Sequence, residues 1–94
     1  MIQQEKIKSV FTIQNDKGLH TRPATELVKC VSNFKCHVTL RYGELNVNAK
    51  SLLGVLMLAA AKGAKIHVEA DGDDAIACID ALLELALKKF HMSY

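Results

Sequence analysis

Four short stretches of this chain alternate between inward and outward residue types, and three other stretches carry apolar residues at helical spacing. A period of two is typical of a strand with one buried face, and a spacing of three or four residues is typical of an amphipathic helix. In chain order, the stretches predict βαββαβα. Strands with one apolar face need a cover, and three amphipathic helices can provide it. The pattern therefore predicts an α+β fold.

The predicted strands are short, and each has a face of mainly apolar residues. Val10 is the exception, because it falls on the polar face of the first strand. Tyr42 and Gly43 are typical of a turn, so the second and third strands should form a hairpin. The inward positions are Ile7, Ser9, Phe11 and Ile13; Cys36, Val38 and Leu40; Leu45 and Val47; and Ala64, Ile66, Val68 and Ala70.

The first and last predicted helices each have one apolar stripe. The first runs from Thr21 to Ser32, and Asn33 should end it in the left-handed conformation. The last runs from Asp74 to Lys89 with Asp73 as its N-cap. Residues His91–Tyr94 look like a frayed tail. The stripes are Ala24, Leu27, Val28 and Val31 in the first helix, and Ile76, Ile79, Leu83, Ala86, Leu87 and Phe90 in the last.

Length and composition set the broad class. Ninety-four residues predict a single domain over 1–94. The net charge is only +2 and there are five aromatic residues, which argues against a nucleic-acid-binding protein. The longest apolar run, 52–61, is about half of what a membrane span needs. Residues 1–6 carry no apolar core of a signal peptide, so a cytoplasmic protein is expected.

Three cysteines, Cys30, Cys36 and Cys78, form no CxxC pair. An odd number of isolated cysteines favours reduced, packed thiols over a metal site or a disulfide framework. His37 and His67 fall on polar strand positions, and His91 is in the tail. No metal-ligand spacing joins these histidines.

The stretch Gly18-Leu19-His20-Thr21-Arg22-Pro23-Ala24 is the strongest candidate for a functional site. Proline is well tolerated in a first helical turn, so His20 should lie at the N-cap of a helix beginning at Thr21. The unpaired N–H groups of a helix N-terminus favour an anion such as phosphate. Taken singly, His20 and Arg22 are more often solvated surface residues; their adjacency is what favours a site for a transferable phosphoryl group.

A second stretch begins at Ser51, a residue type that often caps helices. The short helix after it contains Leu52, Leu53, Val55, Leu56 and Met57, which is more apolar than one buried face requires. Exposed apolar groups that gather in one patch indicate a partner surface. The residues alone leave open whether all of these side chains belong to the core.

Both stretches resemble signatures of the HPr family, the histidine-containing phosphocarriers of the phosphoenolpyruvate:sugar phosphotransferase system. The first is similar to the active-site motif, and Lys50-Ser51-Leu52-Leu53-Gly54-Val55 is similar to the regulatory-serine segment. Gly63-Ala64 and the final helix also match, so the resemblance covers about Ile7 to Phe90. It implies an open-faced β-sandwich, with a four-stranded antiparallel sheet and three helices on one face. It also implies that His20 and Ser51 lie near each other.

The resemblance implies a phosphoryl carrier rather than a free-standing enzyme. His20 would accept a phosphoryl group on Nδ1 from enzyme I, which is charged by phosphoenolpyruvate, and pass it to IIA domains of sugar permeases. Arg22 would stabilise the phosphate, and no metal or cofactor is needed. The partner surface would include Thr21, Leu52, Leu53 and Leu56.

Ser51 matches the serine that an HPr serine kinase/phosphorylase modifies in many members of the family. A phosphate there would weaken docking of enzyme I without unfolding the domain. The alternative is an unmodified N-cap serine.

Other functions remain compatible with the residues. The runner-up is a phosphocarrier of a purely regulatory branch, for nitrogen or metabolic control. A less favoured alternative is an interaction module that is not phosphorylated. We expect a monomer. The chain extends past the usual end of the family, which argues against a terminal carboxylate beside the site.

Overall fold

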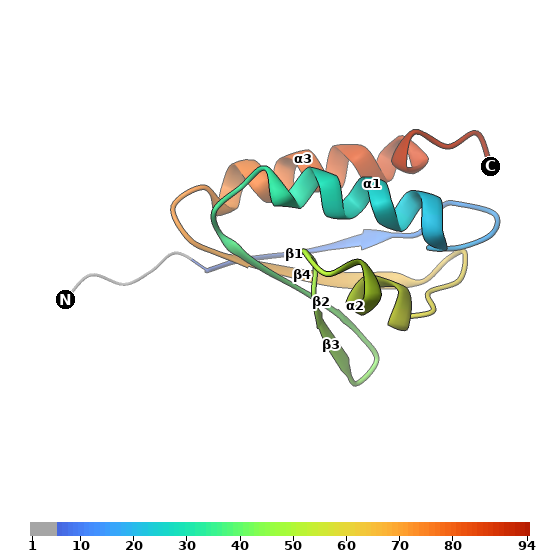
Figure 1. Ribbon diagram of the computed structural model, residues 1–94, viewed down its shortest axis with the longest axis horizontal. Helices are drawn as coiled ribbons and strands as arrows, with labels where there is room; N and C mark the ends of the chain where they lie inside the picture. The colour runs from blue at the N-terminus through green and yellow to red at the C-terminus, as the bar shows by residue number, and fades with distance from the viewer. Residues whose placement is uncertain (1–5) are drawn as a thin grey trace.

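The computed structural model describes residues 6–94 and has the order βαββαβα, followed by a short 3-10 turn (Figure 1). The prediction that residues 1–6 carry no signal-peptide core concerns residues that lie almost entirely outside this range. Within residues 6–94, no helix is long and apolar enough to cross a membrane. The elements are β1 (Lys6–Thr12), α1 (Thr21–Ser32), β2 (His37–Tyr42), β3 (Leu45–Asn48), α2 (Leu52–Met57), β4 (Lys65–Asp71), α3 (Ala75–Leu87) and η1 (Lys89–His91).

The four strands form one antiparallel sheet in the order β1-β4-β2-β3. Tyr42 pairs with Leu45, so the predicted hairpin has a two-residue loop. Gly43 lies at the first loop position with a φ of +62°, as a type II′ turn requires. Leu45 is exposed, contrary to its predicted inward position, because β3 is a short strand at the edge of the sheet.

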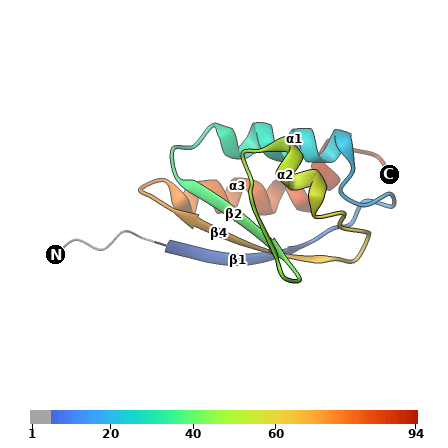
Figure 2. The same cartoon turned by 60° about the horizontal axis from the view of Figure 1, so that its bottom comes forward.

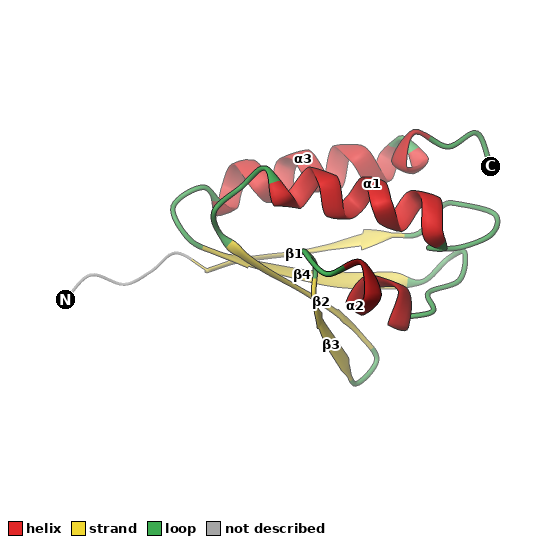
Figure 3. Ribbon diagram, in the orientation of Figure 1, coloured by secondary structure: helices red, strands yellow, loops and turns green. Residues whose placement is uncertain are grey.

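All three helices contribute to one core on one face of the sheet, which confirms the predicted α+β architecture. Helices α1 and α3 lie side by side over the sheet, and α2 packs against α1 and β3 (Figures 2 and 3). The opposite face of β4 carries exposed Lys65 and His67, so this face of the sheet is open. The largest fully buried side chains include Phe90, Ile13, Leu27, Leu40, Ile66, Leu82, Val31 and Val55.

Asp74 changes two of the predicted boundaries. Its carboxylate accepts hydrogen bonds from the N–H groups of Lys35 (2.7 Å) and Cys36 (2.9 Å). These two residues are therefore tied to the beginning of α3, and β2 begins at His37. Asp74, not Asp73, occupies the N-cap of α3, and its side chain makes no cap hydrogen bond within the helix.

The apolar stripe of α3 is rotated relative to the predicted one. Ile76 and Leu87 are exposed, whereas Cys78, Leu82 and Leu85 are buried. This helix is apolar on most of its surface, so spacing alone did not distinguish its buried side. The buried side of α3 is the one that packs against β1, β4 and α1.

Two predicted chain ends also differ. Asn33 ends α1 with a φ of −74°, in the right-handed and not the left-handed region. Residues His91–Tyr94 do not fray: Phe90 is fully buried, and the side chain of Asn15 donates hydrogen bonds to the main-chain oxygens of Lys89 and Tyr94. The tail prediction was wrong because this anchor comes from 74 or more residues away in the sequence.

Candidate functional site

His20 lies at the N-cap of α1, as predicted from Pro23. Its backbone is extended (φ −90°, ψ −166°), and its carbonyl accepts the first helical hydrogen bond from Ala24 (2.9 Å). Its side chain makes no cap hydrogen bond. The N–H groups of Thr21 and Arg22 belong to the helical turn whose donors have no partner within the helix. The imidazole therefore lies beside a helix end that can receive an anion.

Gly18 brings His20 to this position. Its φ is +74°, and a Cβ at this residue would lie 2.4 Å from the carbonyl oxygen of Ala60. Only glycine allows this close approach of two backbones. The next residue, Leu19, donates its N–H to the same oxygen of Ala60 at 2.8 Å. The histidine loop is thus bound directly to the loop between α2 and β4.

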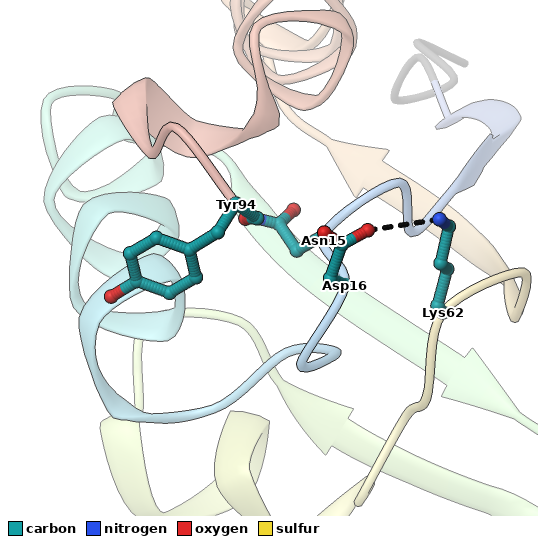
Figure 4. A network of polar contacts seen from close by, with 4 residues as sticks. All are labelled: Asn15, Asp16, Lys62 and Tyr94. Carbon is teal, nitrogen blue, oxygen red and sulfur yellow. Dashed lines mark hydrogen bonds and ion pairs between the residues drawn. The ribbon is translucent and has the colours of Figure 1, made fainter.

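A second contact joins the same two loops. Lys62 Nζ lies 2.9 Å from Asp16 Oδ1 (Figure 4). The hydrogen bond from Lys62 lowers the pKa of the Asp16 carboxyl below its usual value, and the lysine charge adds to the effect. Asp16 is therefore an anion at neutral pH, paired with Lys62 and not free to compete for the helix N-terminus.

A shallow hollow opens beside His20 where the two loops meet the end of α2. Ala59, on its rim, has a φ of 49° without being a glycine, which is a strained backbone conformation of the kind often found near functional sites. The hollow is lined by Lys17, Leu19, His20, Thr21, Leu56, Ala59, Ala60 and Ala61.

The two nitrogens of the half-buried His20 ring have different surroundings. Nε2 is buried and has no hydrogen-bond partner among the described residues. The ring of Tyr94 stacks beside the imidazole, with centroids 5.9 Å apart and planes inclined by 26°. Nδ1 is not among the buried unpaired atoms in the range 6–94. The arrangement favours Nδ1 as the atom that meets an incoming group.

Thr21 and Arg22 are exposed at the beginning of α1. Across residues 6–94, Arg22 forms no ion pair. Its guanidinium is a forked donor suited to phosphate oxygens. The Thr21 carbonyl is used within the helix, where it accepts a hydrogen bond from Thr25 Oγ1 (2.8 Å).

Ser51 is the N-cap of α2, as its residue type predicted. Its Oγ accepts a hydrogen bond from the N–H of Gly54 at 3.1 Å. Ser51 does not line the hollow beside His20; Leu56, near the opposite end of the six-residue helix, does. Ser51 therefore lies at the N-terminal end of α2, and His20 lies near the C-terminal end of the same helix.

The surface of α2 is partly apolar and exposed. Leu53 is 71% exposed and Met57 59%, Leu52 is exposed to a smaller extent, and Leu56 is half-buried. Val55 is fully buried in the core. We call Leu52, Leu53, Leu56 and Met57 the α2 surface. Met57 was not among the predicted partner-binding residues, although it lies four positions after Leu53 and so on the same helical face.

Lys17 and Tyr94 are two further residues of the site that the sequence did not indicate. Lys17 Nζ lies 5.2 Å from the centroid of the Tyr94 ring, in a cation–π arrangement. Lys17 is close to His20 in sequence and could have been suspected. Nothing in the sequence pattern connects Tyr94 to His20.

The three cysteines lie away from this site and show no feature of reactive thiols. Burial raises the pKa of the Cys78 thiol to about 12, and it also raises the pKa values of Cys30 and Cys36. These groups are therefore protonated at neutral pH, whereas the thiolate is the nucleophile and the metal ligand. Over residues 6–94, no cluster of three or more potential metal ligands is present.

Known proteins share both the sequence and the fold. Residues 7–87 match the family model described as PTS HPr component phosphorylation site. The phosphocarrier protein HPr of Xylella fastidiosa (strain Temecula1) is 41% identical over 81 residues, covering 86% of this chain and 91% of that protein.

Two solved structures agree with this match. HPr-C-His from Thermoanaerobacter tengcongensis superposes with a TM-score of 0.89 at 33% identity, covering 94% of this chain and 99% of that one. The phosphocarrier protein HPr of Bacillus anthracis has a TM-score of 0.80 at 28% identity, with 84% and 94% covered. The chain therefore belongs to the HPr family, the phosphocarrier proteins of the phosphoenolpyruvate:sugar phosphotransferase system.

Proposed function

We propose that His20 is the phosphoryl acceptor of this phosphocarrier, receiving the group from enzyme I and passing it to IIA domains of sugar permeases. The observation that carries this proposal is the position of the His20 imidazole. It lies at the open N-terminus of α1, where Nε2 is buried without a hydrogen-bond partner among residues 6–94 and Nδ1 is not one of the buried unpaired atoms of that range. A neutral imidazole is nucleophilic near neutral pH, so the acceptor needs no metal or cofactor.

The transfer step requires only a nucleophile and stabilisation of charge. The Nδ1 lone pair of His20 attacks the phosphorus atom, the bond from phosphorus to the donor breaks, and its electron pair remains on the donor. Positioning and electrostatic stabilisation supply most of the catalysis in such a reaction. The first-turn N–H groups of α1 and the guanidinium of Arg22 provide donors for the phosphoryl oxygens. Release to the next protein is the reverse of this step.

Docking of enzyme I and IIA domains is assigned to Thr21 and the α2 surface. Thr21 and Leu56 line the hollow beside His20, and Leu53 and Met57, on the same short helix as Leu56, are largely exposed. Transient complexes of this kind need only a modest interface. An exposed apolar helix face next to the acceptor meets that requirement.

Ser51 is proposed as a regulatory site for an HPr serine kinase/phosphorylase. Its Oγ already lies at the N-terminus of α2, where a negative charge is compatible with the helix. A phosphate would place about two negative charges beside the apolar α2 surface. The expected consequence is slower transfer from enzyme I with an unchanged fold. A Ser51→Asp protein that is charged as fast as the wild type would contradict this proposal.

A phosphotransfer assay with labelled phosphoenolpyruvate and cognate enzyme I tests the assignment of His20. The wild type should acquire an acid-labile, base-stable label, and His20→Ala should acquire none. His37→Ala is the matched control, because His37 is an exposed histidine on β2 and should be dispensable. Label on His20→Ala, or none on the wild type beside a labelled known carrier, would overturn the proposal. Onward transfer to a sugar-permease IIA domain would distinguish uptake from a purely regulatory branch.

A further inference from the structure

The segment after α3 turns back toward the site through a strained piece of backbone. Lys89, Phe90 and His91 have φ values of 53°, 55° and 66°. For residues other than glycine this left-handed conformation is energetically unfavourable, so it persists only where the surroundings hold it. Phe90 is the first anchor of this segment, because it is fully buried and packs edge-to-face against Phe11 with centroids 6.4 Å apart.

Asn15 is the second anchor of residues 89–94. Its side chain is fully buried, and Nδ2 donates hydrogen bonds to the main-chain oxygens of Lys89 (2.9 Å) and Tyr94 (3.2 Å). One amide group thus binds both ends of the segment 89–94. Figure 4 shows Asn15 beside the main chain of Tyr94. Asn15 is also five residues before His20, so the same loop that presents the histidine fixes the position of Tyr94.

The result is a stack of side chains. The Tyr94 ring lies against the His20 imidazole with a centroid separation of 5.9 Å and an inclination of 26°. The Lys17 ammonium lies over the Tyr94 ring at 5.2 Å. Offset-stacked aromatic pairs attract each other beyond the effect of buried area. The imidazole therefore loses rotational freedom, because turning about its side-chain bonds would break the stack.

We propose that Tyr94 is a positioning residue for phosphoryl transfer, which holds the His20 imidazole in the orientation that presents Nδ1. This inference rests on His20 being the acceptor. The lone pair of Nδ1 lies in the plane of the ring, so a group stacked on one face leaves the path of attack open. The Tyr94 ring is therefore compatible with transfer and does not have to leave. It acts on the reaction through His20 alone.

Three variants test this role: Tyr94→Ala removes the ring, Tyr94→Phe keeps it, and Tyr42→Ala removes an exposed tyrosine from β2 as a control. The first readout is the NMR signal of the His20 ring protons in the unphosphorylated protein. The Tyr94 ring current should give these signals the same positions in the wild type and Tyr94→Phe, and different positions in Tyr94→Ala. This measurement does not depend on phosphoryl transfer.

The second readout is the rate of charging by enzyme I. Tyr94→Ala should lower the maximal rate by about 2- to 10-fold, the range that a stacked aromatic pair represents. The KM for the carrier should stay unchanged, because docking is assigned elsewhere. Tyr94→Phe and Tyr42→Ala should charge at the wild-type rate.

The outcomes separate the two proposals. A lost ring-current shift together with an unchanged maximal rate, or a rise in KM alone, would refute the positioning role. Identical His20 signals in the wild type and Tyr94→Ala would refute the stack itself. Failure of the wild type to be labelled, with the ring-current shift present, would instead count against His20 as the acceptor.

Discussion

Gly18 and His20 are two residues apart, and the backbone of the first determines where the side chain of the second lies. The positive φ of Gly18 and its close approach to Ala60 allow Leu19 to bond the loop after α2. His20 follows at the helix entrance, beside the hollow that this contact creates. The position of His20 thus depends on a residue that has no side chain of its own.

Gly18→Ala is expected to be more destabilising than Gly43→Ala, although both glycines have positive φ. A Cβ at Gly43 would have no atom of residues 6–94, its own chain neighbours apart, within 4 Å, so alanine there costs only the strain of a positive φ, about 1–2 kcal/mol. At Gly18 the methyl group also meets the Ala60 oxygen, and the total loss should reach roughly 3 kcal/mol. Urea unfolding of the two variants measures the difference. Equal losses would show that the close approach relaxes without cost.

Elements that are distant in sequence are joined through single side chains. Asp74 connects the beginning of α3 to the residues before β2, through hydrogen bonds from Lys35 and Cys36. These bonds, the one from Lys35 above all, hold the pKa of the Asp74 carboxyl below its usual value. The carboxylate form is therefore the one that stabilises the fold.

The stability of the protein should fall in acid partly because of Asp74. A lowered folded-state pKa gives stabilisation that is complete above the unfolded pKa of about 3.9 and is lost as the pH falls through the folded-state pKa. Asp74→Asn should be less stable than the wild type at pH 7, and this difference should shrink below about pH 4. Asp73→Asn is the control, since Asp73 is exposed. Chemical unfolding at several pH values tests this, and a pH-independent difference would contradict it.

Helix α2 has a buried apolar residue, Val55, and exposed apolar residues, Leu53 and Met57, within six positions. Leu53 and Leu87 are both 71% exposed, but only Leu53 belongs to the α2 surface. Leu53→Ala should change the free energy of unfolding by less than about 0.5 kcal/mol. It should weaken binding of enzyme I by about 5- to 30-fold, the range of an interface residue worth 1–2 kcal/mol.

Leu87→Ala is the matched control on α3, and it should leave both stability and binding unchanged. Titration calorimetry with enzyme I compares the two leucines directly. Equal effects of the two substitutions on binding would show that α2 is not the docking surface.

At the scale of the whole molecule, Phe90 is a core residue that anchors the segment carrying Tyr94 to His20. It is fully buried after α3, in a left-handed conformation that burial must hold in place. Loss of its ring would leave a cavity next to Phe11 and release the turn that carries Tyr94. Stability and the geometry at His20 are therefore coupled through this residue.

Phe90→Ala should lower the free energy of unfolding by about 3–5 kcal/mol, the usual cost of deleting a buried phenylalanine. Phe34→Ala should cost less, because Phe34 is only partly buried. Urea unfolding gives both values. A loss at Phe90 no greater than at Phe34 would show that residues 89–94 contribute little to the core.

Local patterns in the sequence determined much of this protein. Alternation placed Phe11, Val38 and Ile66 on the inner face of the sheet, Pro23 located His20 at a helix N-cap, and Ser51 was identified as a cap. These features depend on residues within a few positions of one another, so the sequence expresses them directly.

Only the tertiary structure decided the rest. Packing determines which side of the apolar helix α3 is buried. Hydrogen bonds to Asp74 fix the residues before β2, and residues 89–94 turn back so that Tyr94 stacks with His20. Each of these outcomes depends on partners that are far apart in the chain, such as Asn15 and Tyr94. Periodicity and local motifs carry no information about such contacts, because they arise only when the elements pack together.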